Sequence, residues 1–196
     1  EAGAVAVVYT ALVGLWIYRE MTMKSMWDSV KGTLITLGMI TLLLGFGTVF
    51  TRLLIREGMA QAMTDFVLSM SQNKYAILLM MNILLLILGM FIDGIPILII
   101  AVPLLVPIAQ KLGVNLVHLG SIIVFNVGLG VVTPPYAISI FVGTRLAQVP
   151  YGKLVRPMMI YLFVVGIPAL LLTTYIPWLS LWLPTLVLGK QVVGAW

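Results

Sequence analysis

The chain has 196 residues, of which 62% are hydrophobic and only 9% are charged, and its mean hydropathy is +1.17. These values indicate an integral membrane protein rather than an ordinary soluble domain. The net charge of +5 does not indicate a nucleic-acid partner, because the 11 Lys and Arg residues lie singly or in small groups between apolar runs. Without cysteine and with His118 as the single histidine, neither a disulfide framework nor a Cys- or His-ligated metal site is expected.

The apolar runs are long and unbroken, which favours helices over barrel strands, since a helix needs roughly 20 apolar residues to cross a bilayer. The chain starts with Glu1 and runs directly into an apolar segment, so we expect it to be part of a longer protein. A first helix is predicted at residues 2–18, ending at Arg19, and a second at residues 32–50. The segment 19–31 between them reads as a short interfacial connection.

Three glycines of the second predicted helix would let a neighbouring helix approach closely, namely Gly38, Gly45 and Gly47. Residues 58–72 then show apolar side chains at helical spacing, interrupted by polar ones, which predicts an amphipathic helix. We expect it to lie in the membrane interface. A moving arm that couples two domains is the alternative.

Asp93 is the only charge in the apolar run 75–110, and no carboxylate follows it in the chain. An ionisable side chain at membrane depth is costly, so it suggests an ion or substrate pathway. Each limb of this run would be about 25–27 Å long as a helix. A re-entrant hairpin with Asp93 and Gly94 at its tip and two full crossings both fit, and we favour the hairpin. Three prolines weaken the second limb as a straight helix, namely Pro96, Pro103 and Pro107.

The next apolar run, 116–147, is broken around residues 131–135, where the sequence reads VVTPP. Proline removes a backbone donor and clashes with the preceding turn, so an uninterrupted helix is not expected. A final helix is predicted at residues 157–176, with a kink at Pro168 and an end at Pro177. An interfacial aromatic belt would comprise Tyr175, Trp178 and Trp182.

A helix broken inside the membrane exposes unpaired carbonyls at one end and unpaired amides at the other. In broken-helix transporters such carbonyls coordinate sodium, while the positive helix ends face substrate carboxylates. We therefore predict a site for Na⁺, the only metal expected. Its predicted ligands are Asp93, Gly128, Gly130, Val131, Thr133 and Pro134. Asn126 and Pro135 are predicted to contact the substrate.

Structural alternatives stay open for these residues. Asp93 could cap the helix that begins near Gly94 or pair with a basic residue elsewhere in the protein. The segment around Thr133 could be a simple proline kink. We expect Asn82 to be an interhelical hydrogen bonder rather than a ligand, and His118 to be structural or interfacial rather than a proton relay. Because no nucleophile–base pair, phosphate loop or paired carboxylates occur, an enzyme is not expected.

Four segments resemble the C-terminal half of the large membrane subunit of TRAP transporters (tripartite ATP-independent periplasmic transporters). They are EAGAVAVVY (1–9), GMFID (89–93), LGVNLVHLG (112–120) and NVGLGVVTPP (126–135), with Pro103 and Pro107 between the second and third. The resemblance covers essentially the whole chain. It departs at Asn115-Leu116, where the family usually has Asp-Pro, and at Tyr136, where Val is common.

The resemblance implies an all-α integral membrane protein, the C-terminal half of an inverted-repeat, elevator-type transporter with a re-entrant helical hairpin and a broken transmembrane helix. It also implies a bacterial inner (cytoplasmic) membrane location and two partners, a periplasmic substrate-binding protein and a small four-helix membrane subunit, separate or fused. The expected divisions are 1–56 for the first transmembrane helices with their connection, 57–73 for the arm helix, 74–150 for the transport-domain hairpin and broken helix, and 151–196 for the final helix and tail.

The function expected from these features is sodium-coupled uptake of an organic acid such as a C4-dicarboxylate or sialic acid. A single-component divalent-anion/sodium symporter is the nearest alternative, and it would work without a periplasmic protein. A channel or a structural membrane scaffold is a further alternative from a different class, and neither would accumulate substrate against its gradient.

Overall fold

The computed structural model describes residues 2–18 and 21–194, and this part of the chain contains helices and no strand. Glu1 and the predicted helix end at Arg19 lie outside the described residues. The chain divides into two compact units, Glu1–Phe46 and Gly47–Trp196. Four helices within the described residues are long and apolar enough to cross a membrane: Met23–Arg56, Lys74–Phe91, Gly94–Lys111 and Tyr151–Tyr175.

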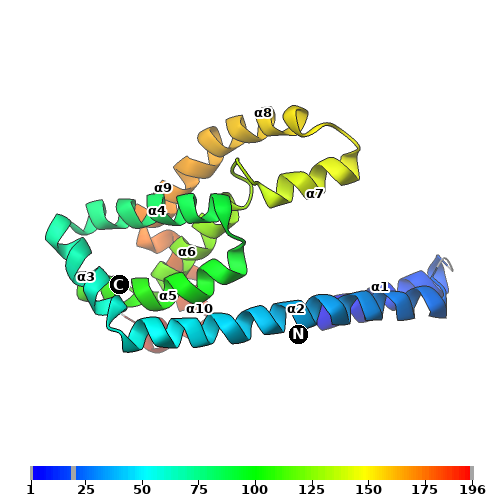
Figure 1. Ribbon diagram of the computed structural model, residues 1–196, viewed down its shortest axis with the longest axis horizontal. Helices are drawn as coiled ribbons and strands as arrows, with labels where there is room; N and C mark the ends of the chain where they lie inside the picture. Colours follow the sequence, from blue (N-terminus) through cyan, green and yellow to red (C-terminus); the bar gives the residue numbers. More distant parts are fainter. Residues whose placement is uncertain (1, 19–20, 195–196) are drawn as a thin grey trace. The chain divides into compact units, whose positions relative to one another are not determined.

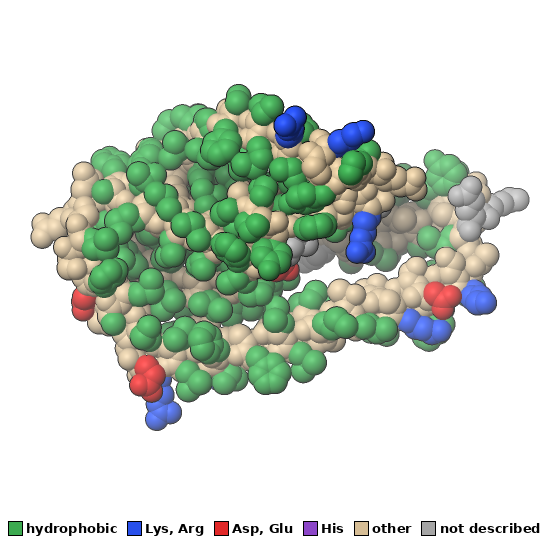
Figure 2. All heavy atoms as spheres, turned by 45° about the horizontal axis from the view of Figure 1, so that its top comes forward, with side chains coloured by type: hydrophobic (Ala, Val, Ile, Leu, Met, Phe, Trp, Pro, Cys, Tyr) green, Lys and Arg blue, Asp and Glu red, His purple; other side chains and the backbone are tan. Residues whose placement is uncertain are grey.

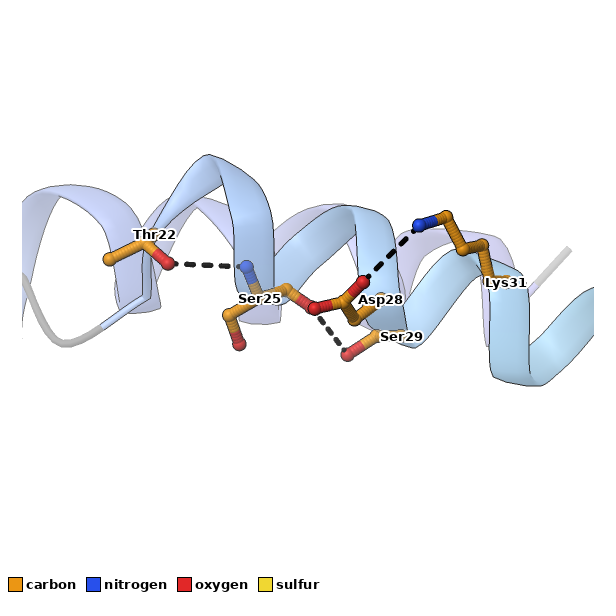
Figure 3. A network of polar contacts seen from close by, with 5 residues as sticks. All are labelled: Thr22, Ser25, Asp28, Ser29 and Lys31. Carbon is orange, nitrogen blue, oxygen red and sulfur yellow. Dashed lines mark hydrogen bonds and ion pairs between the residues drawn. The ribbon is translucent and has the colours of Figure 1, made fainter.

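The first unit contains α1 (Ala2–Leu12), which continues as a π-helical turn, η1 (Val13–Ile17), and the first part of α2 (Met23–Arg56). The second helix therefore begins at Met23 rather than near residue 32. Thr22 explains the early start, because its hydroxyl accepts a hydrogen bond from the Ser25 N–H at 3.1 Å, as an N-cap does (Figure 3). Lys31 and Asp28 pair along the same helix at 3.4 Å. The predicted interfacial connection is thus helical from Met23 onward.

In the second unit, α2 ends at Arg56 and α3 (Met59–Met70) follows a turn at Gly58, whose φ of 72° suits glycine. The amphipathic helix predicted for residues 58–72 is confirmed. Its Val67 and Leu68 pack against the buried core, and Asp65 pairs with Lys111 of α5 (Gly94–Lys111) at 3.2 Å. This part of α3 therefore rests on other helices of the protein, while its Met59, Phe66 and Met70 are exposed.

The apolar run around Asp93 forms two helices, α4 (Lys74–Phe91) and α5, and the chain reverses direction between them at Ile92 and Asp93 (Figure 1). Asn73 caps α4 by accepting from the Tyr75 N–H at 2.9 Å. The prolines expected to weaken the second limb as a straight helix do not end it, because α5 is continuous through Pro103 and Pro107.

A hydrogen bond from a neighbouring helix compensates for one of these prolines. Pro103 has no N–H, so the carbonyl of Ile99, four residues earlier, loses its usual helical donor. The hydroxyl of Thr51 on α2 donates to this carbonyl at 3.1 Å. Gly47, one turn before Thr51, lies against Ile99, and a Cβ at Gly47 would stand 3.1 Å from the Ile99 Cγ2 atom. Of the three glycines predicted to permit close approach, Gly47 therefore does so.

The predicted helix break is confirmed. The first part is α6 (Leu116–Gly130), residues 131–137 are not helical, and α7 (Ile138–Ala147) follows. Asn115 caps α6 with its side-chain oxygen, which accepts from the Val117 and His118 N–H groups. Val131 ends the helix just before the two prolines.

The last predicted helix begins earlier than expected, and further helices follow it in the chain. α8 (Tyr151–Tyr161), a π-helical turn η2 (Leu162–Gly166) and α9 (Ile167–Tyr175) form one apolar stretch. The π turn stands directly before Pro168, where proline removes a helical donor. Pro177 ends this stretch as predicted, but it also starts α10 (Pro177–Leu188), and α11 (Lys190–Val193) follows.

The core of the second unit lies where α4, α5 and α6 pack together, and its fully buried members include Ile77, Leu85, Ile108 and Ile122. Large apolar side chains also cover much of the outer surface, and charged side chains are few on the visible face (Figure 2). An apolar exterior around an apolar core suits a protein surrounded by lipid.

Candidate functional site

The end of the hairpin's first limb and the end of the broken helix lie side by side. On α4 and α6, Asn82 contacts Asn126 at 2.8 Å, and further along both helices Gly89 lies against Gly130. The residue numbers at the two contacts increase in the same direction along both helices, so α4 and α6 run parallel. Their C-terminal ends therefore meet at the helix break.

Close backbone approach makes this meeting possible. A Cβ atom at Gly130 would lie 2.5 Å from the Gly89 Cα, and one at Gly89 would lie 2.7 Å from the Gly130 Cα. No side chain larger than hydrogen fits at either position without movement of the backbone. Gly89 is thus a structural requirement of the site that the sequence pattern did not single out.

The tip of the hairpin extends the contact to the break itself. A Cβ at Gly94 would stand 2.8 Å from Val127 Cγ1, and the rings of Phe91 and Tyr136 lie 6.1 Å apart, edge to face. The structure therefore brings the tip of the hairpin close to the break.

Helix ends give this region its electrostatic character. A helix C-terminus carries the equivalent of about half a negative charge on its unpaired carbonyls. Here the C-termini of α4 and α6 converge, and the exposed carboxylate of Asp93 stands at the turn between α4 and α5. Two helix C-termini and the Asp93 carboxylate therefore bring negative potential to this region, and the N-termini of α5 and α7 bring the opposite partial charge. The region thus combines negative and positive helix ends.

Asp93 takes the capping role that the sequence left open. Its Oδ1 accepts from the Gly94 N–H at 2.8 Å at the start of α5. Among the hydrogen bonds of the described residues, none engages its second carboxylate oxygen and none joins it to Thr133. The residue thus caps a helix and still presents an oxygen to solvent.

The break offers oxygen atoms of two kinds. The Thr133 hydroxyl donates to the Leu129 carbonyl at 2.6 Å, which leaves its lone pairs as acceptors. The hydrogen bonds between residues that the structure describes do not use the carbonyls of Val132, Thr133 or Pro134. Carbonyl and hydroxyl oxygens are the donors that hard cations prefer. The chemistry of this segment therefore fits sodium.

The remaining predicted residues differ in their surroundings. Gly128 and Pro135 are exposed, Val131 and Pro134 are half-buried, and Gly130 and Thr133 are buried. The carbonyl of Pro135 accepts from the Tyr151 hydroxyl at 3.4 Å. Asn126 is fully buried, and its amide donates to Asn82 and to the Ile122 carbonyl. Its predicted contact with substrate stays a prediction.

Asn82 forms interhelical hydrogen bonds, as predicted, because it also donates to the hydroxyl of Thr174 on α9 at 2.9 Å. His118 is packed between α9 and α10, with Nε2 3.2 Å from the Thr174 carbonyl and Nδ1 3.0 Å from the Ser180 hydroxyl. Both ring nitrogens have partners, which agrees with the structural role expected for His118. Thr174 and Ser180 were not predicted from the sequence, although a lone hydroxyl on an apolar helix is a signal for hydrogen bonds between helices.

Fold and site together define a multi-pass helical membrane protein in which a helical hairpin packs its tip against a broken helix. Comparison with known proteins then identifies the family. Residues 1–179 match the family model described as the tripartite ATP-independent periplasmic transporter, DctM component. The chain belongs to this family, that of the TRAP transporter large permease proteins.

Relatives with assigned names support this placement. The sialic acid TRAP transporter large permease protein SiaM of Vibrio cholerae is 34% identical over 96% of this chain and 44% of its own length. The C4-dicarboxylate TRAP transporter large permease protein DctM of Pseudomonas aeruginosa is 35% identical over 94% and 43%, respectively. The isethionate TRAP transporter permease protein DctMQ of Oleidesulfovibrio alaskensis is 34% identical over 90% and 28%.

The chain thus spans less than half the length of these relatives. Their names describe transporter permeases, not enzymes, in agreement with the sequence-based expectation.

Proposed function

We propose that this chain carries a sodium site and part of the substrate site of a secondary transporter that takes up an organic acid. One observation supports the proposal above all: two helix C-termini and the Asp93 carboxylate converge on a segment that carries the Thr133 hydroxyl and unused carbonyls. Sodium would bind there through Asp93, Thr133 and the backbone of the break. Of the other predicted ligands, Val131 and Pro134 belong to the break, while Gly128 and Gly130 lie in the last turn of α6. The carbonyls of Gly130 and Val131 already accept from the Thr133 and Ser139 N–H groups.

The proposed substrate is an organic anion. The three relatives are named for sialic acid, C4-dicarboxylate and isethionate, and each of these compounds carries an acidic group. The N-terminus of α5 at the hairpin tip and that of α7 directly after the break supply positive helix ends for such a group. Bound sodium would hold these ends in the arrangement that accepts the anion.

The proposed transporter works with two partners, a small membrane subunit and a periplasmic substrate-binding protein, in the inner membrane of a bacterium. The hairpin and the broken helix would move together across the membrane as one transport domain. A single-component symporter is the alternative. Uptake by proteoliposomes with and without the binding protein decides between them, because a single-component symporter needs no such partner.

Two substitutions in the complete permease test the sodium site. Asp93→Asn keeps a good N-cap but removes the charge, and Thr133→Val keeps the shape but removes the hydroxyl. We expect each variant to insert normally and to lose most sodium-driven uptake in proteoliposomes, with a half-saturating sodium concentration raised about 10-fold or more.

Matched controls are Asp65→Asn, an exposed carboxylate on α3, and Thr33→Val, whose hydroxyl donates to the Ser29 carbonyl of its own helix. Both should transport like wild type. Unchanged sodium dependence in Asp93→Asn and Thr133→Val would refute the proposed site. If only Asp93→Asn were unchanged, Asp93 would be a helix cap and nothing more.

A further inference from the structure

A hydrogen-bond network of two buried amides and one buried hydroxyl connects α6, α4 and α9. Asn126, Asn82 and Thr174 are 0%, 2% and 1% exposed, respectively. Asn126 Nδ2 donates to Asn82 Oδ1 at 2.8 Å, and Asn82 Nδ2 donates to Thr174 Oγ1 at 2.9 Å. These bonds cross from helix to helix, unlike the many hydroxyls of this protein that donate to their own helix.

Acceptors at both ends fix the direction of the bonds in this network. The Thr174 hydroxyl donates to the Leu170 carbonyl at 2.8 Å, so its oxygen accepts from Asn82. Asn82 therefore turns its nitrogen toward Thr174 and its oxygen toward Asn126. At the other end, the Ile122 carbonyl accepts from Asn126 Nδ2 at 2.9 Å, and the same nitrogen donates to Asn82. The orientation of Asn82 is thus set from α9, and that of Asn126 from its own helix as well.

Asn126 is the last residue of this hydrogen-bond network, and its place there is energetically unfavourable. With its nitrogen bonded to Asn82 and to the Ile122 carbonyl, its Oδ1 is buried and has no partner among the described residues. Two apolar side chains at these positions would stabilise the fold at least as well, because a buried polar atom without a partner is unfavourable. Buried polar pairs are better known for selecting one register between helices.

The register that this pair selects is the one on which the candidate sodium site depends. Asn126 lies one helical turn before Gly130, and Asn82 lies two turns before Gly89. If α4 slid along α6, Gly89 would leave Gly130, and a larger side chain would collide with the backbone. The C-terminus of α4 and the Asp93 turn would then leave the break.

We propose that Asn82 is a positioning residue for the sodium site: through Asn126 and Thr174 it sets the register that brings the hairpin tip to the helix break. The proposal rests on the proposed sodium-coupled function for its transport readout. Asn82 itself does not touch the ion. It acts through the position of α4.

The test compares three variants of the complete permease. Asn82→Leu/Asn126→Leu removes both partners, so no half-bonded amide is left behind. Thr174→Val leaves both amides and the break untouched and removes only the acceptor that orients Asn82. Ser121→Ala is the control, since its hydroxyl donates to the Val117 carbonyl on its own helix.

Two readouts separate position from transport. The first introduces Phe91→Cys and Tyr136→Cys, whose rings lie 6.1 Å apart, into each variant and measures the rate of linkage by a short thiol-specific reagent. This chain has no cysteine of its own, and any in the rest of the permease would be replaced. The second is the half-saturating sodium concentration for uptake in proteoliposomes, measured without the cysteine pair.

We expect the double variant to insert and to unfold at a temperature close to that of wild type, while linkage slows and the half-saturating sodium concentration rises about 10- to 100-fold. Thr174→Val should shift both readouts in the same direction by less, and Ser121→Ala should shift neither. A thermal loss with unchanged linkage and sodium dependence in Thr174→Val would overturn the proposal, as would wild-type readouts in a folded double variant. If the wild type took up substrate without sodium, the proposed function would fail, whereas linkage would still decide the positioning role.

Discussion

Residues 2–46 and 47–194 are similarly apolar but differ in how their helices pack. None of the described residues up to Phe46 is buried, and a Cβ at Gly3, Gly32 or Gly38 would meet nothing within 4 Å. In the second unit, a Cβ at Gly89, Gly130 or Gly166 would lie less than 3.0 Å from a neighbour, and seven polar side chains are buried among the residues that the structure describes. Apolar content therefore does not tell which helices pack.

The physical reason lies in the solvent. Lipid chains are as apolar as leucine, so burying an apolar side chain between helices gains little hydrophobic free energy in a membrane. Close backbone approach and hydrogen bonds between helices discriminate instead. The second unit has both, at Gly89 with Gly130 and at Asn82 with Asn126. The difference between the units can be tested by pairs of substitutions. One substitution of each pair lies at a contact between helices, and the other lies where no such contact exists.

The largest effect is expected for Gly130→Ala. Its Cβ would lie 2.5 Å from the Gly89 Cα, so the two helices must separate, and overpacking of this kind costs about 1–3 kcal/mol. Thermal unfolding in detergent should begin at a lower temperature, and sodium-driven uptake should fall because the hairpin tip moves.

The paired variant is Gly38→Ala, whose Cβ would stand in open space. Alanine favours a helix by about 1 kcal/mol over glycine, so this variant should be neutral or slightly stabilised. Equal stability of the Gly130 and Gly38 variants would show that the α4–α6 contact is not tight.

An intermediate effect is expected for Thr51→Val. The substitution keeps the shape of the side chain but leaves the Ile99 carbonyl without the donor that Pro103 cannot supply, at a cost of about 1 kcal/mol. The thermal midpoint measures the loss. Thr36→Val is the comparison, because the Thr36 hydroxyl donates to the Gly32 carbonyl within the same helix. If both variants unfolded at the same temperature, the hydrogen bond between helices would contribute no more to stability than the one within a helix.

The smallest effect is expected at Asp65. The hydrogen bond from Lys111, together with that from Gln61, holds the pKa of the exposed Asp65 carboxyl below its ordinary value. The folded state therefore favours the ionised form. Its contribution to stability is full above the ordinary carboxyl pKa of about 3.9 and is lost as the pH falls through the lowered pKa.

Asp65→Asn should accordingly unfold slightly earlier than wild type at neutral pH and low salt, and the difference should shrink in acid and in high salt. Thermal midpoints across this pH range measure it. A difference that grew as the pH fell would contradict the assignment, because a protonated Asp65 gains nothing from the Lys111 charge.

Local features predicted much of the fold. The helix break after Gly130 follows from two adjacent prolines, the hairpin turn at Asp93 from a residue type that caps helices, and the membrane location from long apolar runs. The continuity of α5 could not be predicted this way. Pro103 is tolerated because Thr51, far away in the chain, supplies a hydrogen bond.

The candidate site, too, could be predicted from the sequence only in part. Asp93 and Thr133 could be selected from the sequence, because a lone carboxylate and a Gly- and Pro-rich break are unusual inside apolar runs. Their neighbourhood could not be derived from these patterns, since it depends on Gly89 meeting Gly130, on Asn126 donating to Asn82 and on Asn82 donating to Thr174. The sequence alone determined most of the helices, the break at residues 131–135 and the charged residue at the turn, through forces that act within a few residues. It did not give the starts of α2 and α8 or the helices after Ile176. Only the tertiary structure decided that α4 and α6 run parallel and meet at their negative ends, because neighbouring helices in lipid are selected by contacts that no single segment contains.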